Sequence, residues 1–139
     1  MIEYVYKTKY SISDENKYTE WFKKVIASES KYAGDLVYIL TDDSEILKVN
    51  QDYLGHDYFT DIITFEYNKD DEVSGDIFIS LDQIKENAEN YSVTFEEELR
   101  RVMVHGILHL LGYDDKTDKD REKMRELENQ KMKMFHVEQ

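Results

Sequence analysis

The sequence predicts an α/β (α+β) fold in which a small mixed β-sheet packs with about five helices. Short runs rich in β-branched and aromatic residues predict strands, and segments with apolar residues three or four positions apart predict amphipathic helices. No repeat, low-complexity stretch or linker interrupts these segments, and the 139 residues include no proline. We therefore expect one continuous domain over residues 1–139, although the pattern does not determine the order of its strands.

In the N-terminal part, the alternation within residues 2–6 predicts a strand. A helix is expected next, capped by Ser13, running to about Ser30 and ended by Gly34. Its apolar side chains fall at helical spacing: Tyr18, Trp21, Phe22, Val25 and Ile26. The apolar run DLVYIL, residues 35–40, is typical of a strand that is covered on both faces.

The second helix is expected to begin at Asp42, because Glu45 stands three positions after it and apolar residues follow. The segments DIITFEY and GDIFISL, residues 61–67 and 75–81, predict a pair of strands joined by a polar loop. Three further helices complete the pattern. A short one carries Ile84, Ala88 and Tyr91, a longer one runs from about Thr94 to Leu111, and the last, capped by Thr117, carries Met124, Leu127 and Met134. We expect two or more helices on each side of the sheet.

Composition limits the classes of function. The chain has no cysteine, so any zinc would be held by nitrogen and oxygen ligands, and disulfides are excluded. Neither a signal sequence nor a run of about 20 apolar residues is visible, and we expect a soluble cytoplasmic protein with no membrane partner. The net charge of −13 opposes nucleic-acid binding, but 18 acidic and only 4 basic residues fall within residues 34–100, whereas residues 101–139 are balanced.

The segment HGILHLLGYDD, residues 105–115, is the strongest candidate for a site. In a helix, His105 and His109 lie about 40° apart around the axis and can reach one ion. A glycine at position 112 can end the helix in a left-handed conformation and let the chain fold back, so that Asp115 becomes a third ligand. The fourth tetrahedral position would stay open, as in catalytic zinc sites. We therefore expect a metal site at the end of this helix.

A simpler interpretation is that both histidines are ordinary buried residues and that Asp114 and Asp115 belong to a turn. The surroundings favour the metal, because every other residue from Val102 to Leu111 is apolar or glycine, which predicts a helix buried nearly all round. Each imidazole there needs a partner, since an unsatisfied buried polar group costs about 1–3 kcal/mol. One metal ion would satisfy both.

The same segment disfavours a minimal zinc metallopeptidase. Peptidases with a helical zinc site carry H-E-x-x-H, in which the glutamate is the general base. Gly106 occupies that position here. Any hydrolysis would have to take its base from elsewhere or depend on the metal lowering the pKa of its water.

At this level of detail the sequence resembles the YbeY family of rRNA maturation factors, which are metal-dependent endoribonucleases. HGILHLLGYDD is similar to the family signature H-G-x-L-H-L-x-G-Y-D-H, VNQDYLGHDYFTDIITFEY to its N-x-x-Y-R and T-D-x-x-S-F stretches, and SGDIFIS to its G-D-I strand. The resemblance covers nearly the whole chain. It implies one Zn²⁺ per chain, cleavage of single-stranded RNA, and 16S rRNA 3′-end maturation and ribosome quality control on the small subunit.

The match has two departures. The position of the third family ligand, a histidine, holds Asp115, whose carboxylate is an ordinary zinc ligand but shifts preference towards harder ions. The family arginine expected to contact phosphate corresponds to Leu54, which cannot donate a hydrogen bond; His56, Lys116 and Arg101 are the candidate replacements. His56 is also compatible with a plain turn residue, and Lys116 with a solvated surface charge.

The remaining family positions carry no assigned role: Thr60, Asp61 and Asp76 match the family, and His136 is expected at the surface. Our leading hypothesis is a zinc-dependent, single-strand-specific endoribonuclease with metal ligands His105, His109 and Asp115 and unknown catalytic residues. The alternative is a ribosome-associated RNA-processing factor with a structural zinc and weak or no nuclease activity, consistent with Leu54.

Overall fold

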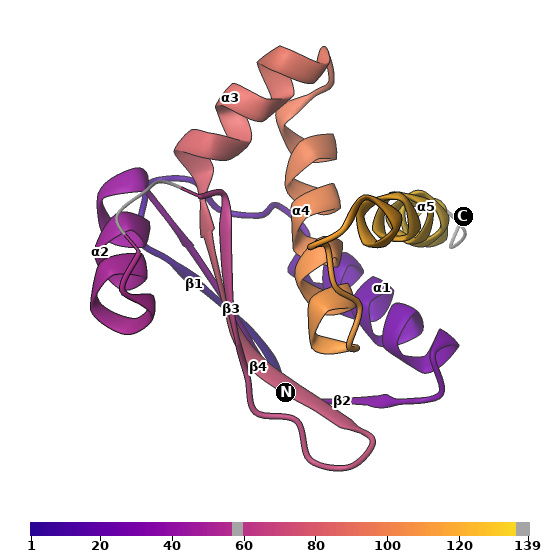
Figure 1. Cartoon of the computed structure of the whole chain (residues 1–139). Coiled ribbons are helices and arrows are strands. Elements are labelled where there is room, and N and C mark those ends of the chain that lie inside the picture. Colours follow the sequence, from indigo (N-terminus) through magenta and orange to yellow (C-terminus); the bar gives the residue numbers. More distant parts are fainter. Residues whose placement is uncertain (57–59, 136–139) are drawn as a thin grey trace.

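The computed structural model describes residues 1–56 and 60–135. Over these ranges the chain forms four strands and five helices, which confirms the predicted mixed α/β architecture (Figure 1). The elements in chain order are β1 (Ile2–Tyr6), α1 (Glu15–Ser28), β2 (Tyr32–Thr41), α2 (Asp43–Leu54), β3 (Ile62–Glu66), β4 (Glu72–Ser80), α3 (Leu81–Tyr91), α4 (Phe95–Leu110) and α5 (Asp118–Met134).

The strands are ordered β1-β2-β4-β3 in the sheet. β1, β2 and β4 run parallel to one another, and β3 is antiparallel to β4, with Ile62 opposite Ile79 and Glu66 opposite Gly75. The hairpin between β3 and β4 is the predicted strand pair, and the parallel strands explain why DLVYIL is nearly continuously apolar. This order brings β3 and β4 under the helix that carries the two histidines.

The two faces of the sheet are covered unequally (Figure 1). Helices α1 and α4 pack on one face over the main core, with α5 against them, while α2 packs on the other face against a small cluster of Ile46, Val49 and Ile63. The expectation of two or more helices on each side is therefore wrong for the described part of the chain. On this second face α2 packs against Ile63 of β3, with Phe65 and Phe78 partly buried beside it.

The predicted helix starts are confirmed where a local capping pattern exists. The side chains of Asp42, Thr94 and Thr117 accept hydrogen bonds from backbone N–H groups at the starts of α2, α4 and α5. In α1, however, the N-cap is Asp14 rather than Ser13. Among the helices of the described ranges, none is both long and apolar enough to cross a membrane.

The prediction that Gly34 ends the first helix is wrong. Helix α1 ends at Ser28, and Ser30 takes the left-handed conformation with φ of 63°. Gly34 lies inside β2, where the register shifts between Ala33 and Leu36. A Cβ at position 34 would lie 2.3 Å from the Ser74 side chain, so the glycine allows a close approach of two strands.

Tyr91 also differs from the expectation. Ile84 and Ala88 form the buried side of α3, but Tyr91 at the end of the helix is 62% exposed. Its ring therefore faces solvent instead of the core.

Candidate metal centre

Helix α4 places both histidines on one side. Leu99, Met103 and Ile107 are fully buried against the core, and Thr94 caps the N-terminus of the helix. The side chains of His105 and His109 are 18% and 24% exposed, so they lie at the edge of the core. The expected helix, buried nearly all round, is therefore open along the strip that carries the two imidazoles.

The end of α4 turns the chain back towards these histidines. Gly112 has φ of +102° and donates its N–H to the carbonyl of His109, while the Tyr113 N–H donates to the carbonyl of Leu108. This is the paired hydrogen-bond pattern of a Schellman motif, in which a residue at positive φ ends a helix. The reversal brings Asp115 alongside the helix, as the glycine predicted.

His105, His109 and Asp115 come together with candidate ligand atoms within 4.8 Å of one another. The Oδ2 atom of Asp115 lies 3.3 Å from Nε2 of His105 and 3.4 Å from Nε2 of His109. Two ligand atoms about 2.0–2.1 Å from a tetrahedral ion are separated by about 3.3–3.4 Å. The Asp115 oxygen therefore lies at the distance from both imidazole nitrogens that a tetrahedral N₂O site for zinc requires.

The other ring nitrogens fix the orientation of both imidazoles. Nδ1 of His105 lies 2.7 Å from Oε2 of Glu128, and Nδ1 of His109 lies 3.0 Å from the carbonyl oxygen of Tyr113. Both acceptors require a proton on Nδ1, which leaves each Nε2 with its lone pair towards Asp115. A carboxylate or carbonyl behind a metal-binding histidine is the usual outer support of such sites.

The two histidines have opposite pKa shifts. Burial lowers the pKa of His105, but the hydrogen bond and negative charge of Glu128, with Asp115, outweigh it and leave the pKa above its ordinary value. Burial and the neighbouring His105 lower the pKa of His109, and its contacts with Asp115 and Tyr113 only partly oppose this. Since a bound metal needs both rings neutral, His105 is the ligand at which protons compete more strongly.

Glu128 is the functional residue that the sequence did not single out. It is buried on α5, and besides His105 it accepts a hydrogen bond from Nη1 of Arg101 at 3.2 Å. Nε of Arg125 is 3.8 Å from the same carboxylate oxygen. One signal was available: Glu128 stands four positions after Met124, so it falls on the apolar stripe of the last helix, where a charged residue needs a partner.

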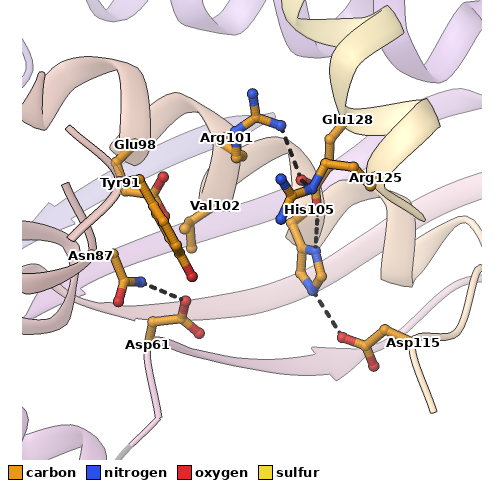
Figure 2. Close-up of a pocket in the computed structure, with 10 residues that line it drawn as sticks. All are labelled: Asp61, Asn87, Tyr91, Glu98, Arg101, Val102, His105, Asp115, Arg125 and Glu128. Atoms are coloured by element: carbon orange, nitrogen blue, oxygen red, sulfur yellow. Dashed lines mark hydrogen bonds and ion pairs between the residues drawn. The ribbon is translucent and has the colours of Figure 1, made fainter. Parts of the chain in front are cut away.

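A polar cavity of about 230 Å³ opens beside His105 (Figure 2). Tyr91, Asn87 and Asp61 lie on one side of it, and Glu128 and Arg125 on the other. A neighbouring cavity is lined by the three candidate ligands together with the start of β3, at Thr60, Asp61, Ile62 and Thr64.

Asp61 is the residue outside the candidate ligand set that lines both cavities. Burial raises its pKa, which nearby His105 and the hydrogen bond donated by Asn87 oppose. No role was predicted for Asp61 from the sequence. The structure places Asp61 at both cavities, beside the candidate ligands His105 and Asp115.

The other residues that the sequence analysis named lie at different distances from the candidate metal centre. Leu54 and His56 line a separate cavity with Thr60 and Ile62, while Lys116 is exposed in the loop before α5. Of the suggested replacements for the family arginine, Arg101 is the one that lines the cavity beside His105. His136 lies outside the described residues.

Asp76 and Gly106 face away from the centre. Asp76 accepts a hydrogen bond from Tyr67 and alternates with Ile77, which packs towards α4, so it lies on the opposite face of the sheet. A Cβ at Gly106 would meet Ile62 at 3.0 Å and Ile77 at 3.1 Å. A glutamate would not fit at this position, which gives the peptidase hypothesis no structural support.

The fold and the site define a class of small α/β protein in which one buried helix and the loop after it present a His-His-Asp group able to bind a metal ion. Comparison with known proteins identifies the family. The family described as Endoribonuclease YbeY matches residues 3–136, and the chain belongs to it.

Individual relatives agree with this membership. Endoribonuclease YbeY of Flavobacterium johnsoniae is 50% identical over 139 residues and covers both chains completely. That of Bacteroides thetaiotaomicron is 53% identical over 116 residues, which is 84% of this chain and 85% of the relative. A solution structure of a Thermotoga maritima protein superposes with a TM-score of 0.71 at 35% identity, covering 99% of this chain and 91% of that one.

Proposed function

We propose that this protein is a zinc-dependent endoribonuclease that cleaves single-stranded RNA in 16S rRNA 3′-end maturation and ribosome quality control. The observation that carries the proposal is the spacing of the donor atoms, 3.3 and 3.4 Å from Asp115 to the two histidines, in a chain of the YbeY family. Its partners would be rRNA and the small ribosomal subunit, and its place of action the cytoplasm.

The proposed ligands are His105, His109 and Asp115, holding one Zn²⁺ per chain. When bound, zinc with an open position supplies a Lewis acid for a phosphoryl oxygen and lowers the pKa of a water molecule. The chain itself fixes the direction of each imidazole through Glu128 and the Tyr113 carbonyl. Asp61, held by Asn87, offers a carboxyl group to a hydroxyl or water that enters either cavity.

Cleavage and metal content test this function together. A single-stranded rRNA 3′-end fragment would be incubated with the untagged wild type, with His109→Ala and with Lys48→Gln, a control on the exposed side of α2. We expect about one zinc per wild-type chain, and cleavage by wild type and the lysine control but not by His109→Ala. Equal residual cleavage by wild type and His109→Ala would indicate a contaminating nuclease and contradict the proposal.

One observation favours a second function. Leu54 replaces the arginine that the family resemblance leads us to expect, and it is exposed, at 44%, beside Thr60 and Ile62. A protein without that cation could bind ribosomal RNA around a structural zinc and cleave it weakly or not at all. Full zinc occupancy with RNA binding but no cleavage would support this alternative.

A further inference from the structure

Two cavities meet at Arg101. The cavity beside His105 is lined by Arg101 and Arg125, and a second cavity between α4 and α5 is lined by Arg100, Arg101 and Lys133, with Glu97 as its acidic residue. Cations are scarce in this chain, which carries 18 basic and 31 acidic residues. Four of them line the path formed by these two cavities, which share Arg101. The path starts at the candidate metal centre, where Asp61, Glu98, Asp115 and Glu128 also line the first cavity.

The α5 side of this path follows from the helical repeat. Arg125, Asn129 and Lys133 are spaced four residues apart, so they lie on one side of the helix, and all three are exposed. Arg125 and Lys133 are separated by about 12 Å along the axis. That length corresponds to about three phosphates of a stacked strand.

The two arginines that line the cavity beside His105 keep N–H donors for a ligand. Arg101 donates from one nitrogen, Nη1, to both Glu128 and Asn129. A guanidinium carries five N–H donors in a planar fork that suits phosphate. The side chain of Arg125 is 65% exposed, and its contact with Glu128 is 3.8 Å long, so it can turn towards a ligand.

An aromatic ring stands on the opposite side of the same cavity. Tyr91, at the end of α3, is 62% exposed and lines the cavity across from Arg125 (Figure 2). Exposed aromatic rings beside cationic grooves are the usual platforms on which unpaired bases stack. A duplex would not offer a free base face to this ring.

We propose that the cavity beside the metal centre binds one nucleotide of a single RNA strand, with its phosphate at Arg101 and Arg125 and its base on Tyr91, and that the backbone continues between α4 and α5 towards Lys133. This inference rests on the proposed function, which it deepens. It assigns the substrate contacts to residues of α3, α4 and α5, and it supplies cations that Leu54 does not.

An RNA-binding measurement tests this inference without depending on cleavage. A fluorescein-labelled, 2′-O-methylated single strand is titrated with zinc-loaded protein at several salt concentrations, and its length is checked on a gel afterwards. Arg125→Gln and Lys133→Gln should each lower the affinity about fivefold at 0.1 M salt and reduce the salt slope by about 0.7, the share of one phosphate contact on a single strand. Lys48→Gln, which removes the same charge from α2, should match the wild type.

Substitutions of Tyr91 provide a second test of the same inference. Tyr91→Ala should weaken binding of the single strand at least about fivefold, whereas Tyr91→Phe should retain it and neither should change binding of a duplex. Variants of Arg125, Lys133 and Tyr91 that bind like Lys48→Gln would overturn the inference, and so would a wild type that does not bind the strand. The proposed function fails by a different result, equal cleavage by wild type and His109→Ala, so the two failures are distinguishable.

Discussion

Nδ1 of His105 on α4 and Oε2 of Glu128 on α5 are 2.7 Å apart, although the two residues are 23 positions apart in the chain. This hydrogen bond joins the helix that carries two candidate ligands to the helix that ends the described fold. It selects the tautomer of His105 whose Nε2 faces Asp115. The packing of α4 on α5 therefore orients His105 at the candidate centre, through a residue that lies far from both histidines in the sequence.

Glu128→Gln should weaken zinc binding about 10- to 100-fold, the usual effect of removing the support behind a metal-binding histidine. Glutamine can still accept a hydrogen bond from Nδ1, but it removes the negative charge that makes the ring a better ligand. Competition with a chromophoric chelator measures the affinity. Glu126→Gln, an exposed acid on the same helix, is the matched control and should bind zinc like the wild type. Unchanged affinity of Glu128→Gln would contradict the assigned role.

The third ligand can be tested by restoring the family residue. Asp115→His should keep one zinc per chain and increase the preference for Zn²⁺ over Mn²⁺, because imidazole is a softer ligand than carboxylate. Asp115→Ala should lose most of the affinity. Asp114→His changes the exposed neighbouring residue and should leave metal content unaltered. Mass spectrometry of metals after dialysis measures all three, and full occupancy in Asp115→Ala would exclude this residue as a ligand.

Glu29 should make the stability of the fold depend on acid pH. Its carboxylate accepts hydrogen bonds from Tyr113 at 2.6 Å and from Lys131, a buried residue, at 3.0 Å. Burial acts to raise the pKa of Glu29, but these two donors outweigh it and leave the pKa below its ordinary value of 4.5. A lowered pKa means that the contribution of Glu29 is complete above about pH 4.5 and is lost as the pH falls through the folded-state pKa.

Glu29→Gln should therefore cost about 1–3 kcal/mol of unfolding free energy at pH 7, and the difference from the wild type should shrink as the pH falls below 4.5. Urea denaturation at a series of pH values measures both quantities. Glu20→Gln on the same helix breaks only an exposed ion pair with Lys23 and should change stability by less than about 0.5 kcal/mol. A Glu29→Gln deficit that stays constant down to pH 3 would show that the ionised carboxylate is not what stabilises the contact.

Local patterns carried most of what the sequence could predict. Thr117 caps the helix that it was expected to cap, α4 begins next to Thr94 as expected, and Gly112 ends α4 in a left-handed conformation, because each of these features depends on a few neighbouring residues. The spacing of His105 and His109 likewise follows from the helix alone.

What the sequence could not predict depends on distant contacts. Glu128 reaches His105 only after α5 has packed on α4, and the exposure of Tyr91 depends on where α3 leaves the core. The mistaken helix end has a local origin. Ser30 instead of a glycine adopts the positive φ after α1, and Gly34 serves the close approach of β2 to β4. Strand order also arises from the assembled sheet and not from any single segment.

Restoring the family arginine gives the last prediction. The cavity lined by Leu54 adjoins the cavity that contains the candidate ligands. Both are lined by Thr60, Ile62 and Thr64. An arginine there could reach a phosphate from the β3 side, opposite the cations of α4 and α5. Leu54→Arg should therefore raise cleavage of single-stranded RNA and partly compensate for Arg125→Gln in the double variant.

The neighbouring Tyr53 provides the control, because it is 73% exposed and Tyr53→Arg adds the same charge to α2 one position away. Initial rates at low substrate concentration, with the affinity for the 2′-O-methylated strand measured in parallel, separate binding from chemistry. If Tyr53→Arg increases cleavage as much as Leu54→Arg, the gain comes from general charge attraction. A gain confined to Leu54→Arg means that position 54 contacts the RNA beside the metal centre, and that its leucine limits the activity of this chain.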